Sequence, residues 1–269
     1  MPEAHALMPA AEPAPPRAAS PRVSHAVGTA GWRLWEYGTV RSTNDLADSL
    51  PAWSAVRADF QTAGRGRFGR VFVSDPGGLW ISAVLPAEGG PQKWAGFSLM
   101  VGIHLVRMLE DLSVPEARLR WPNDLMAGRK KLGGLLIGQS ARDTMIVGFG
   151  LNVSNAPWRI DPALARLSTS LDQVLPDPAP EVFGLAVRTL NALADAHQEM
   201  QEGGMPAAIR QLNDRWIQPV PVRISLSEGG HASGHFAGLN PQGHLRLTDG
   251  AGCEFLVPHH SVEKLVEIY

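Results

Sequence analysis

Two long helical patterns set among short strand patterns are the feature that most constrains the fold of this chain. Within residues 92–112, large apolar side chains recur every three or four positions, which predicts one amphipathic helix. A second pattern of this kind covers residues 183–197. Shorter segments rich in apolar residues predict strands over 33–40, 55–60, 71–74, 79–85, 118–121, 130–138 and 144–152. Together these patterns predict an α+β fold.

The two ends of the chain differ from this central part. Residues 1–30 are dominated by Ala and Pro and cannot bury enough surface to offset the entropy of ordering, so we expect a disordered tail. From residue 218 to residue 269, alternating apolar residues and glycine-rich turns predict a small β-barrel. Residues 31–217 form the predicted main domain, and no helix-turn-helix domain is expected before it.

Composition narrows the class of protein further. Lys and Arg total 24 against 26 Asp and Glu, and this near-neutral balance argues against broad nucleic-acid binding. The single cysteine, Cys253, excludes an internal disulfide and a cysteine-based zinc site. No apolar run approaches the roughly 18 residues of a membrane span, and the first residues do not resemble a secretory signal. We therefore expect a cytoplasmic protein without a membrane segment.

A basic, glycine-rich loop follows the predicted strand 55–60. Residues 64–69 (GRGRFG) match a dinucleotide-binding fingerprint formally, but that motif requires a following helix and here a strand pattern follows. Arg65, Arg67 and Arg70 repel one another unless an anion binds, and arginines on a flexible backbone are good donors to phosphate or carboxylate. We expect this loop to be mobile when empty and ordered by an anionic ligand; a solvated basic turn is the alternative.

A second polar segment supports an anion site. Residues 120–124 (RWPND) place an amide and a carboxylate beside a Pro break, and Lys131 follows seven residues later. The chain contains only four lysines against 20 arginines, which favours a specific role for a lysine as a compact point charge. Lys130, by contrast, can simply be solvated.

Taken in order and with their spacing, these segments resemble the biotin protein ligases over roughly residues 33–265. The residues that carry the resemblance are 42–44 (STN), 61–70 (QTAGRGRFGR), 120–124 (RWPND), 131–134 (KLGG) and 148–152 (GFGLN). The resemblance implies a mixed-sheet catalytic domain of the biotin/lipoate ligase type with a small C-terminal SH3-like β-barrel.

The resemblance also implies a two-step reaction. Biotin's carboxylate attacks the α-phosphorus of ATP, with Mg²⁺, to give biotinyl-5′-AMP and pyrophosphate. The ε-amine of a lysine on a biotin carboxyl carrier protein, a subunit or domain of acetyl-CoA carboxylase, then attacks the mixed anhydride. Such a first step brings anions together, so cationic side chains are needed to stabilise its transition state. A homodimer is possible.

Site residues can be carried over position by position from the resemblance. It implies Lys131 and Arg67 as catalytic residues; Ser42, Thr43, Asn44, Gln61, Gly64, Arg65, Gly66, Arg67, Lys131 and Gly134 as biotin-binding residues; Arg65, Arg67, Arg70, Asn123, Asp124 and Asn152 as ATP- and adenylate-binding residues; and Asp124 as a metal ligand. Trp80 either lines the site of the biotin tail or belongs to the core.

The sequence departs from the family pattern at two places, and two other functions are alternatives. Residues 71–74 (VFVS) weaken the aromatic-plus-Ser pattern after the loop, and residues 257–262 (VPHHSV) replace a common Gly-Glu pair.

A lipoate ligase or octanoyltransferase of the same fold is the nearest alternative function, but its Arg-Arg and His-Asp patterns are missing. A biotin-responsive transcriptional repressor is the other, and without a recognisable DNA-binding domain we expect no specific DNA binding.

Overall fold

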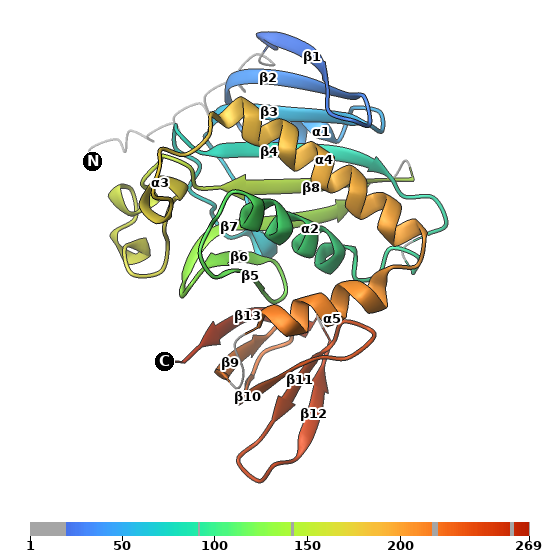
Figure 1. The fold of residues 1–269 in the computed structure, drawn as a ribbon, viewed down its shortest axis with the longest axis vertical. Helices are drawn as coiled ribbons and strands as arrows, with labels where there is room; N and C mark the ends of the chain where they lie inside the picture. The colour runs from blue at the N-terminus through green and yellow to red at the C-terminus, as the bar shows by residue number, and fades with distance from the viewer. Residues whose placement is uncertain (1–19, 91, 141–142, 217–219, 259–260, 269) are drawn as a thin grey trace, which may run out of the picture.

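The computed structural model of the protein describes residues 20–90, 92–140, 143–216, 220–258 and 261–268. An eight-stranded mixed sheet with helices on both faces is followed by a five-stranded antiparallel sheet (Figure 1). The predicted α+β fold is therefore confirmed. Among the described residues, no helix combines the length and the apolar character needed to cross a membrane.

The large sheet is antiparallel except for one pair of strands. Its order is β1-β2-β3-β4-β8-β7-β6-β5. The strands are β1 (Val23–Val27), β2 (Trp32–Val40), β3 (Ser54–Gln61), β4 (Leu79–Pro86), β5 (Ala117–Arg120), β6 (Asp124–Ala127), β7 (Lys130–Gln139) and β8 (Thr144–Leu151). β2 and β3 run parallel, with Val40 opposite Gln61. Because parallel strands end at the same edge of a sheet, the segments that follow these two residues start side by side.

Successive side chains of a strand point to opposite faces of the large sheet, and each face packs against its own apolar core. Ala55 belongs to the larger core with α2 (Phe97–Asp111) and α4 (Val182–Gln201), which contact each other. Its neighbour Val56 points the opposite way, into a smaller core with Ala47 of α1 (Thr43–Ala47). The short α1 therefore covers the face of the sheet opposite to the two long helices.

The C-terminal sheet shares the larger core. Its strands, in the order β12-β11-β10-β9-β13, are β9 (Val220–Leu226), β10 (His231–Leu239), β11 (Leu245–Thr248), β12 (Glu254–Val257) and β13 (Val262–Glu267). Trp121 of the main domain donates a buried hydrogen bond of 3.1 Å to the carbonyl of Gly243 in the turn between β10 and β11. Trp216 stacks on Phe236 of β10 with the ring centroids 3.9 Å apart. The two sheets therefore pack as one body.

Four sequence predictions are corrected by the structure. β1 lies inside the segment predicted as a disordered tail; the rest of that prediction, over residues 1–19, lies outside the described residues. The helix predicted over 92–112 begins only at Phe97 because Gly96, with φ 82°, cannot continue a helix backward. Residues 71–74 form a single bridge from Val71 to Arg65 and no strand.

The fourth correction is an additional helix, α5 (Met205–Arg215), which joins α4 to the second sheet. Shorter helical segments complete the fold: the 3-10 helices η1 (Arg67–Gly69), η2 (Pro157–Arg159) and η3 (Pro162–Leu164), and the α-helix α3 (Leu171–Val174).

Candidate active site

One cavity of about 390 Å³ lies against the large sheet, between the arginine loop and strand β13. Most of the site residues predicted from the sequence line it: Ser42, Thr43, Asn44, Gln61, Arg65, Gly66, Arg67, Arg70, Asn123, Asp124, Lys131 and Gly134. Arg67 and Lys131 therefore share the cavity. Its uncharged polar residues Ser42, Thr43, Asn44 and Gln61 lie where β2 and β3 end. Its cations come from the arginine loop after β3, from Arg120 of β5 and from Lys131 of β7.

A network of uncharged polar groups forms one end of the cavity. Gln61 Oε1 accepts the backbone N–H of Thr43 at 2.8 Å, because the parallel pairing of β2 and β3 brings these residues together. Gln61 Nε2 donates to Ser74 Oγ at 2.9 Å. Thr43 Oγ1 lies 2.6 Å from the hydroxyl of Ser82 on β4. This end can therefore form several directed hydrogen bonds with a neutral polar ligand.

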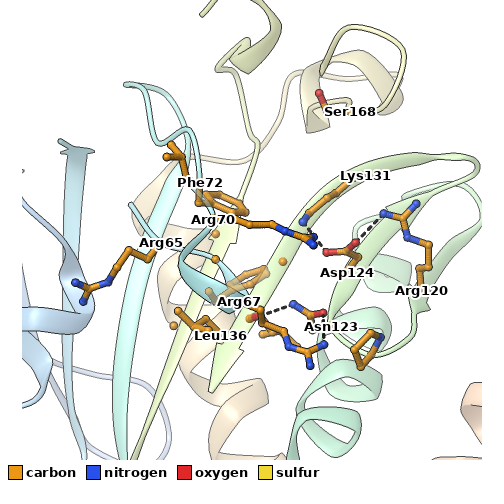
Figure 2. A pocket seen from close by; sticks show the side chains of 18 of the residues that line it. Arg65, Arg67, Arg70, Phe72, Arg120, Asn123, Asp124, Lys131, Leu136 and Ser168 are labelled. Carbon is orange, nitrogen blue, oxygen red and sulfur yellow. Dashed lines mark hydrogen bonds and ion pairs between the residues drawn. The ribbon is translucent and has the colours of Figure 1, made fainter. Parts of the chain in front are cut away.

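Asp124 and Lys131 form the charged end of the cavity. Asp124 Oδ1 lies 2.5 Å from Lys131 Nζ, and Oδ2 lies 2.7 Å from Arg120 Nη2 (Figure 2). Burial alone would raise the pKa of Asp124, but the two cations outweigh it and hold that pKa below its ordinary value. Asp124 is thus a carboxylate at neutral pH, and it holds both cations at one place.

The arginines of the loop point in different directions. Arg65 pairs with Asp45 of α1 and points away from Lys131 (Figure 2). Arg67 donates to Asn123 Oδ1 at 3.4 Å and to a carbonyl of β13 at 3.1 Å. Arg70 pairs with Glu263 of β13 at 2.6 Å. The expectation that the three arginines confront one another holds only for Arg67 and Arg70, since the charge of Arg70 lowers the pKa of Arg67. Acceptors within the protein engage all three arginines.

Arg67 is the most buried cation of the loop. Burial lowers the pKa of its guanidinium, Asp124 opposes that change, and the neighbouring Arg70 adds to it. An arginine remains charged under these conditions, so burial without an anionic ligand is unfavourable for it. A phosphate or carboxylate bound in the cavity would offset this cost.

Three residues named in the sequence analysis lie outside the cavity lining. Gly64 has no space for a side chain, since a Cβ atom would lie 2.4 Å from Ser74 Oγ and 2.5 Å from the carbonyl of Phe72. The Asn152 amide donates to the carbonyl of Thr169 at 2.9 Å and accepts from Asn155 at 3.1 Å. Trp80 is 1% exposed and belongs to the core. Gly64 therefore allows the loop to pack closely against Phe72 and Ser74, whereas the role of Asn152 in binding ATP stays a prediction.

Sequence reasoning missed three parts of the site. The ring of Phe72 occupies the space where a Cβ of Gly150 would lie, and Lys131 Nζ lies 5.5 Å from its centroid. Ser82 is fully buried behind Thr43. Residues 263–266 of β13 line the opposite wall. A polar residue inside the apolar run of β4 is a signal for Ser82, whereas only tertiary structure brings β13 here.

The carboxylates of the described residues limit how the site could hold a magnesium ion. They contain no group of three or more His, Cys, Asp or Glu side chains placed to hold a metal. Asp124 is the cavity carboxylate nearest to Lys131, and both its oxygens are engaged by cations. This donor set fits a Mg²⁺ ion held mainly by phosphate oxygens and water, with at most one protein carboxylate. His259 and His260 lie outside the described residues.

Comparison with known proteins places the chain in a family. Residues 38–152 match the model of the Biotin/lipoate A/B protein ligase family. The biotin--[acetyl-CoA-carboxylase] ligase of Mycobacterium tuberculosis is 31% identical over 235 residues, which are 82% of this chain and 85% of that protein. The chain belongs to this family, and the match over most of its length places it among the biotin protein ligases.

Two further similarities complete the comparison. The bifunctional ligase/repressor BirA of Bacillus subtilis is 33% identical over 141 residues, and the match spans 50% of this chain but only 43% of BirA. The structure of the biotin protein ligase from Aquifex aeolicus in complex with biotin and ATP superposes with a TM-score of 0.76 at 23% identity. It covers 87% of this chain and 99% of that one. The fold of the two chains is therefore the same.

Proposed function

We propose that the protein attaches biotin to a lysine of a biotin carboxyl carrier protein through a biotinyl-5′-AMP intermediate. The observation that carries this proposal is the composition of the cavity that most of the predicted site residues line. It has a neutral hydrogen-bonding end, where β2 and β3 end, and a cationic end at β5 and β7 of the same sheet. Biotin has the matching asymmetry, because its ureido ring is neutral and polar and its other end is a carboxylate.

The polar end favours biotin over the acids used by the alternative enzymes of the same fold. Lipoate and octanoate end in a dithiolane ring or an alkyl chain, and neither offers good hydrogen-bond partners. Thr43, Asn44 and Gln61 would be desolvated against such a group without new hydrogen bonds. A site built to hydrogen-bond a ligand discriminates strongly against an analogue that lacks those groups.

The cationic end supports adenylation. The attack of a carboxylate on the α-phosphorus of ATP brings negative charges together, and preorganised cations stabilise that arrangement. In this proposal Lys131 lies between the biotin carboxylate and the α-phosphate, and Arg67 contacts the phosphate. Asp124 orients Lys131 until the ligands arrive. Mg²⁺ would neutralise the phosphates of ATP, with Asp124 as its protein ligand.

The second step concerns the carrier protein and the C-terminal sheet. The relatives named biotin--[acetyl-CoA-carboxylase] ligase support a carrier domain of acetyl-CoA carboxylase as the partner. We further propose that the five-stranded sheet is the SH3-like barrel expected from the sequence. Its strand β13 contributes Glu263 to the cavity wall, which supports a role of this sheet in holding ligands. The homodimer and the cytoplasmic location remain predictions.

Incubation with biotin, Mg-ATP and a purified biotin carboxyl carrier domain tests the proposal. We expect intact-mass analysis to show the carrier heavier by one biotinyl group, and a carrier whose acceptor lysine is replaced by Arg to stay unmodified. Lipoate and octanoate, run in parallel, distinguish the alternative enzymes. Transfer of either acid in preference to biotin, or no transfer of any acid, would refute the proposed function.

A further inference from the structure

Ser82 is a buried hydroxyl directly behind the polar end of the cavity. It lies in the middle of β4, it is 0% exposed, and it does not line the cavity itself. Its oxygen lies 2.6 Å from Thr43 Oγ1 and hydrogen-bonds the side-chain oxygen of Asn44. A fully buried serine in an apolar strand therefore contacts two residues that line the cavity.

The directions of these hydrogen bonds follow from the number of protons available. A hydroxyl has one proton and an amide oxygen can only accept, so Ser82 donates to Asn44 Oδ1. Thr43 Oγ1 lies 2.6 Å from Ser82 Oγ and 3.1 Å from Gln61 Oε1, and its single proton goes to the shorter contact, so Thr43 donates to Ser82. Gln61 Oε1 is satisfied by the backbone N–H of Thr43 at 2.8 Å. The chain of donors therefore runs from Thr43 through Ser82 to Asn44.

This order leaves the NH₂ group of Asn44 available to a ligand. Asn44 lines the cavity, and within the described part of the chain its oxygen, not its nitrogen, takes part in a hydrogen bond. Gly148 of β8 lies against the same amide, because a Cβ there would be 2.6 Å from Oδ1 and 3.1 Å from Nδ2 of Asn44. The amide is thus fixed by a hydrogen bond from one side and by limited space on the other.

We propose that Ser82 is a positioning residue that determines specificity: it turns the Asn44 amide so that this residue donates to a carbonyl oxygen on the ring of the ligand. The inference rests on the proposed function, in which that carbonyl is the one of biotin's ureido group. A fixed donor favours a ligand with an acceptor at that point. It disfavours a ligand with an N–H there, since two donors would then face each other.

Binding of biotin and of 2-iminobiotin tests this assignment, since the analogue carries nitrogen in place of the ureido oxygen. Isothermal titration of the full chain at pH 7 should show wild type binding biotin far more tightly than 2-iminobiotin. Ser82→Ala should weaken biotin binding by about tenfold or more and 2-iminobiotin by less than about threefold, so the preference falls. Ser54→Ala is the matched control, because Ser54 is a buried serine of the adjacent strand β3 that does not line the cavity.

A kinetic readout separates positioning from a general structural effect. In ATP–pyrophosphate exchange, Ser82→Ala should raise the KM for biotin and leave both kcat and the KM for ATP near their wild-type values. Gly148→Ala perturbs the same amide from the other side, through a clash with the end of one side chain. It should reduce the preference for biotin in the same way, and it provides the test if Ser82→Ala does not fold.

The outcomes distinguish this inference from the proposed function. Equal losses for the two ligands, or unchanged biotin binding in both variants, would overturn the role of Ser82 while wild-type biotin transfer stands. A wild-type chain that binds neither biotin nor its analogue, yet uses another acid, would overturn the proposed function.

Discussion

Replacement of Glu267 by Gln should destabilise the whole protein, because it breaks a buried ion pair between the two sheets. Arg118 of β5 donates to both carboxylate oxygens of Glu267 on β13, at 2.7 and 2.8 Å. The side chains are 3% and 1% exposed. Removal of one partner leaves a buried charge without its counter-charge, which costs about 3–5 kcal/mol of the free energy of unfolding. The same guanidinium also lies 3.3 Å from the carbonyl of Gly128.

The magnitude can be checked by thermal and urea unfolding. For a chain of this size each kcal/mol lowers Tm by about 2–4 °C, so Glu267→Gln should lower it by about 6–20 °C. Glu254→Gln is the matched control, since Glu254 pairs with Arg246 in the same sheet and that pair is about two-fifths exposed. Screening by solvent makes such a pair weak, and this variant should unfold like wild type.

A double variant tests the reasoning about charge directly. Arg118→Met combined with Glu267→Leu replaces the pair by apolar groups of similar volume, and it should recover most of the lost stability. If Glu267→Gln unfolds at the same temperature and urea concentration as Glu254→Gln, the buried pair is not what holds the two sheets together. Failure of the double variant to recover stability would show that hydrogen bonding, not uncompensated charge, dominates.

The remaining predictions concern the cavity. Lys131→Ala should nearly abolish ATP–pyrophosphate exchange with unchanged circular dichroism, whereas the neighbouring exposed Lys130→Ala should retain it; similar activity of both variants would remove Lys131 from its role. Arg67→Ala should weaken retention of biotinyl-AMP more than binding of biotin, and equal losses in a filter-binding assay would refute a phosphate contact. The pKa of Asp124 is lowered, so the stability that its carboxylate contributes is complete above the ordinary pKa of 3.8 and is lost as pH falls through the lower pKa of the folded state. Asp124 therefore stays ionised between pH 5 and 9. Over that range the pH profile of exchange activity should have the same shape in wild type and in Asp124→Asn. Biotin with ATP should reduce proteolysis within residues 64–70, and Glu263→Gln, which frees Arg70, should increase it in the empty protein; unchanged cleavage would contradict ordering of the loop.

The regular parts of the fold could be predicted because local patterns determine them. β2, β4, β7 and β8 coincide with predicted strands, and α4 with a predicted helix, since each buries apolar side chains in one or both of the two cores. β1 was missed because its five residues lie in a stretch rich in Ala and Pro, and pairing with β2 supplies what its sequence lacks. α5 has Pro206 in its first turn, and a proline at that place is typical of a helix start, so its beginning has a signal in the sequence.

The candidate site also has a part that the sequence predicts and a part that only the tertiary fold determines. The motifs identified Lys131, Asp124 and the loop arginines because charged residues at fixed spacing are visible in one sequence. The partners of those arginines could not be predicted. Glu263, the partner of Arg70, lies far away in the sequence. Asp45, the partner of Arg65, is nearer in the sequence, but only the tertiary fold brings it to the loop. Val71 shows that a local pattern can also mislead. Its β-branched side chain favoured a strand, but it is 84% exposed and packs against no core that would stabilise one.

The shared core has a consequence for any attempt to separate the two sheets. Trp121, Trp216 and Phe236 form one buried cluster across the boundary, together with the ring stacking and the indole hydrogen bond described above. A chain cut after residue 217 would not yield an independently folded catalytic domain. It would expose the indole rings of Trp121 and Trp216 to water, and its cavity would lose the wall that β13 forms. Chimaeras that exchange the last fifty or so residues with a relative must therefore carry the facing tryptophans along with them.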